Sequence, residues 1–197
     1  MKWLKAAAME LLASAQKLIN ELDESQVEKL IQMILNAKDK KIFVIGMGRS
    51  GFVGRAFALR LMNLGFNVYF IGETITPAAT KDDLLIAISG SGTTRIVLTV
   101  SQAAKDIGAK VIAITSRPES PLGKVADHVV VIGGRTKLAH EEEYLARQLF
   151  GEREPLSPLG TMFENNCMIF LDGLIVELMH RLGKTENELL RFHATIE

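Results

Sequence analysis

The chain has 197 residues, of which 48% are apolar, which suits one domain with a hydrophobic core and excludes a disordered protein. Lys and Arg together number 23, as do Asp and Glu, so the net charge is zero and the basic excess typical of nucleic-acid-binding proteins is absent. A net charge near zero tolerates self-association. We therefore expect one domain over residues 1–197 that forms a homo-oligomer and does not bind nucleic acid.

Residues 4–22 repeat apolar side chains at spacings of three and four, which predicts an amphipathic helix. A secretory signal is a poorer interpretation, because Glu10 interrupts the apolar run. No stretch approaches the ~20 uninterrupted apolar residues of a membrane span, so we expect no membrane partner and a cytoplasmic location. The single cysteine, Cys167, lies in an apolar, helix-like run, which favours a buried core thiol over a nucleophile.

A second amphipathic helix follows, with Ser25 to Glu28 in the form of a capping box. Beyond residue 38 the pattern changes to short, continuous apolar runs, which are typical of strands buried on both faces of a parallel sheet. These runs cover residues 42–45, 68–71, 84–88, 111–114 and 129–132.

Helical segments separate these strands, at residues 52–64, 95–107 and about 121–126. Gly65 and Gly108 follow the first two segments, as expected just past a helix C-terminus. Alternating strands and helices predict an α/β fold, a three-layer sandwich around a five-stranded parallel flavodoxin-like sheet. This core occupies residues 39–197, and residues 1–38 form extra N-terminal helices.

The C-terminal third contains a long charged connection over residues 133–159, whose middle, around 141–150, is expected to be helical. Long connections in compact domains are often lids or partner surfaces. A long helix over about 162–181 follows, and Thr185 caps a short final helix.

The first strand leads into a glycine-rich loop, Gly46-Met47-Gly48-Arg49-Ser50-Gly51, which satisfies G-x-G-x-x-G between a strand and a helix. Glu73 follows the second strand, where a dinucleotide-binding fold places its ribose-binding acid. Taken alone, this loop fits a nicotinamide cofactor.

The third strand leads into a second loop, Ser89-Gly90-Ser91-Gly92-Thr93-Thr94, which favours phosphate instead. Glycines let backbone N–H groups converge on an anion, hydroxyls donate further hydrogen bonds, and the N-terminus of the next helix adds positive potential. In the strand order 2-1-3-4-5, this loop and loop 46–51 border the same crevice, at the carboxyl ends of neighbouring strands. The alternative is that both loops are tight turns whose hydroxyls only cap helices.

With its loops G-x-G-x-S and S-x-S-G-x-T, the chain resembles the sugar isomerase (SIS) family, whose domains bind phosphosugars. The likeness covers nearly the whole chain and is closest to the short, single-domain 6-phospho-3-hexuloisomerases. It extends to the segments Leu84 to Gly92, Leu159 to Glu164 and His193 to Glu197. That branch usually ends in H-A-N-L-E, so Thr195 and Ile196 depart from its pattern while His193 is kept.

The resemblance implies an enzyme that isomerises 3-hexulose 6-phosphate to fructose 6-phosphate through an enediol, as in the ribulose monophosphate pathway of formaldehyde fixation. It implies a small sugar phosphate as partner, no cofactor, and an oligomer, with a tetramer favoured. Two other functions stay open, an arabinose 5-phosphate isomerase and a sugar-phosphate-binding regulator. The sequence has too few residues before the first strand for the DNA-binding domain of such a regulator.

An isomerase needs a base beside the carbon acid and an acid near the oxygens. The resemblance points to Glu164 as the base, although Thr161 to Glu164 also has the form of a capping box. His193 is expected to be the acid or a ring-handling group, and to complete the active site across a subunit interface. The alternatives are a disordered tail and a tail that folds back onto its own crevice. The remaining expected site residues bind substrate: Gly48, Arg49 and Ser50 in the first loop, and Ser89, Ser91 and Thr94 in the second.

Several other polar residues have weaker or structural roles in this interpretation. Arg49 is expected to reach the substrate or to pair with Glu73, and Thr115-Ser116 is a weaker candidate for the crevice wall. Glu177 and His180 form one E-x-x-H motif, and a carboxylate-bridged metal pair needs two, so we expect no metal. His128 is expected to be a surface or packing residue, and His140 to face solvent.

Overall fold

Five parallel strands form one sheet in the order β2-β1-β3-β4-β5, which confirms the predicted flavodoxin-like topology. The computed structural model describes residues 1–134 and 156–189. Each strand lies within one or two residues of its predicted range, because a continuous apolar run marks a strand that is covered on both faces. The strands are β1 (Lys41–Gly46), β2 (Asn67–Phe70), β3 (Leu84–Ile88), β4 (Lys110–Thr115) and β5 (His128–Val131).

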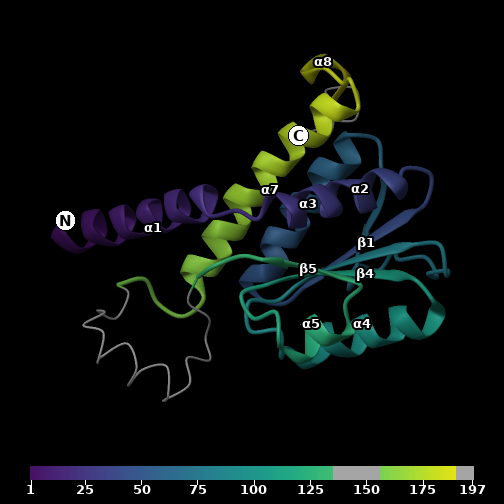
Figure 1. Cartoon of the computed structure of the whole chain (residues 1–197), viewed down its shortest axis with the longest axis horizontal. Coiled ribbons are helices and arrows are strands. Elements are labelled where there is room, and N and C mark those ends of the chain that lie inside the picture. The colour runs from purple at the N-terminus through teal and green to yellow at the C-terminus, as the bar shows by residue number, and fades with distance from the viewer. Residues whose placement is uncertain (135–155, 190–197) are drawn as a thin grey trace.

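Helices cover both faces of the sheet and make the predicted three layers (Figure 1). Alternate strand residues point to opposite faces. Val44 and Ile86 therefore pack with one set of helices, whereas Ile45 and Leu85 pack with the other. The first set comprises α2 (Glu24–Asn36), α3 (Arg49–Asn63) and α7 (Thr161–Arg181), and the second comprises α4 (Arg95–Ile107) and α5 (Pro121–Val125).

Helix α1 (Lys2–Asn20) contacts α7 and extends beyond the rest of the fold (Figure 1). Only Ala15 and Leu18 on this helix are buried, whereas Trp3 and Leu4 are exposed. The predicted amphipathic helix therefore exists, and its fully buried residues lie in its C-terminal half. Polar contacts with residues of the described C-terminal part attach it, from Asn166 to Ser14 and from the Leu156 backbone N–H to Glu10.

Helix α2 begins earlier than the capping box placed it, so the predicted cap at Ser25 is wrong. Asp23 is the N-cap, and its carboxylate accepts hydrogen bonds from the backbone N–H groups of Ser25 and Gln26, at 2.9 and 3.1 Å. The Glu28 carboxylate instead accepts a hydrogen bond from Arg181 on α7, at 2.7 Å. Hydrogen bonds from Arg181, and then from Gln32, lower the pKa of Glu28 to about 2.

Three other helix ends follow the sequence signals. Gly108 closes α4 in the left-handed conformation, with φ of 94°, and Gly65 follows the C-cap of α3. Before α8 (Glu186–Leu189), the Thr185 hydroxyl and backbone N–H both contact Glu188, so Thr185 caps this helix as predicted. The helix expected around 141–150 lies outside the described residues. No helix in the described part of the chain is long and apolar enough to cross a membrane.

Candidate active site

The strand order places the ends of β1 and β3 side by side, with α3 and α4 leaving toward opposite faces of the sheet. At the end of β1, Gly48 is the N-cap of α3 with φ of 58° and ψ of −130°. This backbone conformation is accessible essentially only to glycine. It starts the helix at once, so Arg49 and Ser50 lie in its first turn.

The second loop, residues 89–94, is held in shape by internal hydrogen bonds. The hydroxyls of Ser89 and Thr94 share a hydrogen bond of 3.0 Å, and the Thr93 hydroxyl donates to Ser91 Oγ at 3.0 Å. Gly92 has φ of 63°, and a Cβ there would lie 1.9 Å from Ser120 Oγ, so only glycine fits. The loop is therefore a fixed turn that presents several hydroxyls together.

The residues that follow β4 support this loop from behind. The side-chain hydroxyls of Thr115 and Ser116 both donate to the Gly90 carbonyl oxygen, at 3.1 and 2.7 Å. Neither residue is among those that line the hollow between the loops, so Thr115-Ser116 supports the second loop and does not form the crevice wall as predicted.

A small polar hollow of about 80 Å³ opens between the two loops and the start of α7. It brings together five of the predicted site residues: Ser50, Ser89, Ser91, Thr94 and Glu164. Thr94 is the N-cap of α4, yet its side chain makes no capping hydrogen bond, and the first turn of α4 has no acidic residue. The interpretation of these hydroxyls as helix caps therefore fails at Thr94, and the positive end of α4 is left for an anion.

Glu164 lies in the first turn of α7, and its side chain is only 6% exposed. The capping-box interpretation of this residue is wrong, because Gly160 is the N-cap and the Thr161 hydroxyl donates to the Pro158 carbonyl oxygen instead. The Glu164 carboxylate accepts a hydrogen bond from Arg49 Nε on α3. Helices α3 and α7 pack together, so two residues 115 positions apart form one ion pair.

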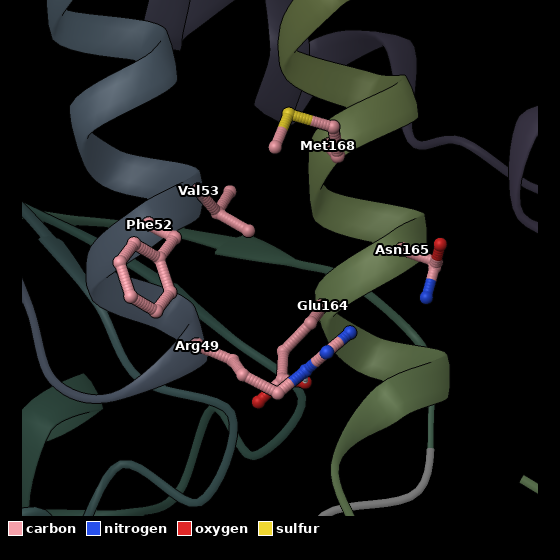
Figure 2. A pocket seen from close by; sticks show the side chains of 6 residues that line it. All are labelled: Arg49, Phe52, Val53, Glu164, Asn165 and Met168. Atoms are coloured by element: carbon pink, nitrogen blue, oxygen red, sulfur yellow. Dashed lines mark hydrogen bonds and ion pairs between the residues drawn. The ribbon is translucent and has the colours of Figure 1, made fainter.

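A second hollow, of about 180 Å³, lies on the other side of this ion pair. Figure 2 shows Arg49 reaching from α3 toward Glu164 on α7, with Phe52, Val53 and Met168 above them. The residues lining this hollow are mostly apolar apart from the ion pair: Arg49, Phe52, Val53, Glu164, Asn165 and Met168. Glu164 thus lies at the boundary between a polar hollow and a more apolar one.

Comparison with known proteins identifies the family of this chain. Residues 34–137 match the SIS domain family, which is more than half of the chain. This chain belongs to the SIS domain family. An uncharacterized protein of Aeropyrum pernix is 49% identical over 91% of this chain and 85% of its own length. A protein of Methanocaldococcus jannaschii named 3-hexulose-6-phosphate isomerase is 42% identical, over 90% of this chain and 87% of its own.

A solved structure gives the same result for the fold. A protein of Methanococcus jannaschii, whose crystal structure led to an inferred function as a 3-hexulose-6-phosphate isomerase, aligns with a TM-score of 0.77. It is 40% identical, and the alignment covers both chains completely. Within the SIS family, the chain therefore resembles the 3-hexulose-6-phosphate isomerases.

Several other residues whose roles were predicted from the sequence lie away from the two hollows. Arg49 does not pair with Glu73, which binds Arg55 at 3.0 Å instead. Cys167 is fully buried as predicted, and burial, followed by the charge of Glu164, raises the pKa of its thiol well above the usual value. A thiol in this state does not act as a nucleophile.

The histidines and the E-x-x-H motif were also assigned roles from the sequence. His128 is buried and its Nε2 lies 2.8 Å from the Gln26 carbonyl oxygen, which confirms a packing role. Glu177 of the E-x-x-H motif pairs with Arg181 at 2.7 Å. Among residues 1–134 and 156–189, no group of three or more metal-ligating side chains comes together. His140 and His193 lie outside the described residues.

Sequence reasoning missed Gly160 and Phe163, which line the polar hollow of the SIS domain, and Phe52, Asn165 and Met168, which line the second one. Gly160 and Phe163 stand next to Thr161 and Glu164 in a segment that carried the family resemblance, and this was the available signal. For Phe52 and Met168 no signal existed, because apolar residues on a helix look the same whether they face a core or a site.

Proposed function

We propose that this SIS-domain enzyme isomerises 3-hexulose 6-phosphate to fructose 6-phosphate. The observation that carries the proposal is that one polar hollow at the topological switch point is lined by both a hydroxyl cradle and a buried carboxylate. The first feature suits a phosphate group, and the second suits a base. The relatives named 3-hexulose-6-phosphate isomerase, similar along most of the chain, support the same reaction.

The proposed phosphate site consists of Ser89, Ser91 and Thr94 at the start of α4. A hollow of about 80 Å³ suits a phosphate-sized group, whereas drug-sized ligands fill pockets of ~300 Å³ or more. The sugar carbons therefore extend beyond the cradle. In the proposed complex they pass Glu164 and are also contacted by Gly48 and Ser50 of the first loop.

In the proposed mechanism, Glu164 removes the proton from C2 of the 3-ketose and returns it to C3. The enediol between these steps carries its double bond between C2 and C3, and the hydroxyl proton on O2 moves to O3. A base and an acid at fixed positions typically accelerate such proton transfers by ~10²–10⁴-fold each. His193 is the proposed acid for the oxygens. The reaction as written consumes no cofactor.

Two broader aspects are also proposals. We infer a homo-oligomer, with a tetramer favoured, in which His193 reaches the site of a neighbouring subunit. We also infer that the enzyme acts in the cytoplasm, in the ribulose monophosphate pathway, where formaldehyde fixation produces the 3-hexulose 6-phosphate.

The test is to incubate the purified protein separately with 3-hexulose 6-phosphate and with ribulose 5-phosphate, and to identify the products. We expect fructose 6-phosphate from the first substrate. Arabinose 5-phosphate from the second substrate, with no fructose 6-phosphate from the first, would favour the arabinose 5-phosphate isomerase instead. Tight binding of either phosphosugar without any product would indicate a regulator. Deuterium from solvent should enter fructose 6-phosphate at C3, the carbon that receives the proton, since an abstracted proton exchanges with water.

A further inference from the structure

The two carboxylate oxygens of Glu164 have different surroundings. Oε2 accepts the hydrogen bond from Arg49 Nε. Oε1 lies beside Gly160, since a Cβ added to Gly160 would come within 3.3 Å of it. Gly160 and Glu164 both line the polar hollow, together with Ser89 and Thr94. Oε1 is therefore placed next to the cradle, where the substrate is expected.

Arg49 and Glu164 differ strongly in burial. The Glu164 side chain is 6% exposed, whereas that of Arg49 is 59% exposed. In the described part of the chain, Arg49 is the only cationic residue that forms an ion pair with Glu164. A buried carboxylate without a partner is costly, so the charge of Glu164 is best balanced when Arg49 holds Oε2.

We propose that Arg49 and Gly160 together select which oxygen of Glu164 takes up the substrate proton. Arg49 occupies Oε2, and the missing side chain at Gly160 leaves Oε1 open toward the polar hollow. This inference rests on the proposed function, in which Glu164 is the base. It makes Arg49 a positioning residue and changes its expected role, because the sequence had suggested direct contact with the substrate.

Gly160→Ala tests whether Oε1 of Glu164 is the oxygen that takes up the substrate proton. The backbone of Gly160 has φ of −88° and ψ of 12°, which alanine can adopt, but the new methyl group would crowd Oε1 at 3.3 Å. We expect kcat to fall about tenfold, because small misplacements of a catalytic group are costly, while the affinity for fructose 6-phosphate changes little. Tm should fall only modestly, since alanine is a poorer N-cap than glycine.

Gly173→Ala is the matched control, because it makes the same change on the same helix. A Cβ added to Gly173 would meet nothing within 4 Å, so this variant should keep the wild-type kcat and KM. A loss of kcat in the control equal to that of Gly160→Ala would mean that any change in α7 lowers activity, and this would overturn the inference.

Arg49→Ala provides an independent test that does not depend on how Gly160→Ala folds. A positioning residue should lower kcat with little change in KM, and guanidinium ion at concentrations well below denaturing should restore part of the lost kcat. A rise in KM with kcat unchanged would make Arg49 a substrate ligand and would overturn its role. Arg49→Lys should have a lower kcat than the wild type, because an ammonium group lacks the planar fork of a guanidinium group.

Glu164→Gln separates failure of this inference from failure of the proposed function. If Glu164→Gln keeps wild-type activity, Glu164 is not the base and the proposed mechanism is wrong. If Glu164→Gln is inactive but Gly160→Ala keeps wild-type kcat and KM, the proposed base stands and the selection of Oε1 is wrong.

Discussion

Removing two hydroxyls of the second loop, by Ser91→Ala together with Thr94→Val, tests the proposed phosphate cradle. Valine keeps the shape of threonine, and the Thr94 side chain makes no capping hydrogen bond to α4, so the helix should persist. The Thr94 hydroxyl shares a hydrogen bond of 3.0 Å with Ser89 Oγ. The variant therefore removes two anion donors and keeps α4, but it also removes the hydrogen bonds that Ser91 Oγ accepts from Thr93 within the loop.

The expected effect follows from the number of donors removed. A hydrogen bond to a charged group contributes ~1.5–3 kcal/mol, so two lost donors weaken phosphate binding by ~3–6 kcal/mol. Since ~1.4 kcal/mol is a factor of ten, KM should rise by ~10²–10⁴-fold. Solvent that enters the enlarged hollow and contacts the phosphate would place the result at the lower end of this range.

The assay compares equilibrium binding of fructose 6-phosphate with binding of unphosphorylated fructose. The phosphosugar should lose affinity and any weak binding of fructose should not change. Thr99→Val is the matched control on α4, since the Thr99 hydroxyl donates to the Arg95 carbonyl oxygen, is exposed, and does not line the hollow. Wild-type affinity of the double variant for fructose 6-phosphate would refute the cradle. An equal loss in Thr99→Val would show that the effect is not specific to the loop.

Three further predictions concern the base, the tail and the pH dependence of stability. Glu164→Gln should lower kcat by ~10²–10⁴-fold with an unchanged circular dichroism spectrum; a loss of Tm without a loss of specific activity would leave it a structural role only. Mixing inactive Glu164→Gln with inactive His193→Ala under conditions of subunit exchange should restore part of the activity, and no recovery despite exchange would place both residues in one subunit's site. The folded-state pKa of Glu28 is lowered to about 2 from 4.5, so its contribution to stability is present above pH 4.5 and is lost as the pH falls toward 2. The free energy of unfolding, measured with urea, should therefore fall less with decreasing pH in Glu28→Gln than in the wild type over this range. An equal fall in both proteins would contradict the lowered pKa of Glu28.

Elements whose signals are local could be predicted from the sequence. Residues 84–88 and 95–107 were predicted with the bounds that the structure has, because an apolar run and an amphipathic period are properties of adjacent residues. The two loops could also be placed together, since parallel strands carry their carboxyl ends to one edge of the sheet. The hydroxyls of residues 89–94 were thus identified as site candidates before their geometry was known, whereas Glu164 was identified by the family resemblance.

Competition between nearby polar groups was harder to predict. Ser25 and Asp23 both suit an N-cap, and the structure uses Asp23, while Glu28 turns to Arg181 on another helix. The same kind of choice arose at Thr161, where the helix is capped by Gly160. A capping motif specifies a possible hydrogen bond, but the tertiary neighbours decide whether its members have better partners.

The sequence by itself determined the chain of elements, the strand order and the residue types around the crevice, because these depend on local periodicity and on the geometry of parallel sheets. Only the tertiary structure decided that Arg49 pairs with Glu164, that Glu73 pairs with Arg55, and that the hydroxyls of Thr115 and Ser116 support the second loop. These contacts depend on how α3 packs against α7 and β2 and on how β4 lies beside β3. Partners so far apart in the chain leave no spacing that a single sequence reveals.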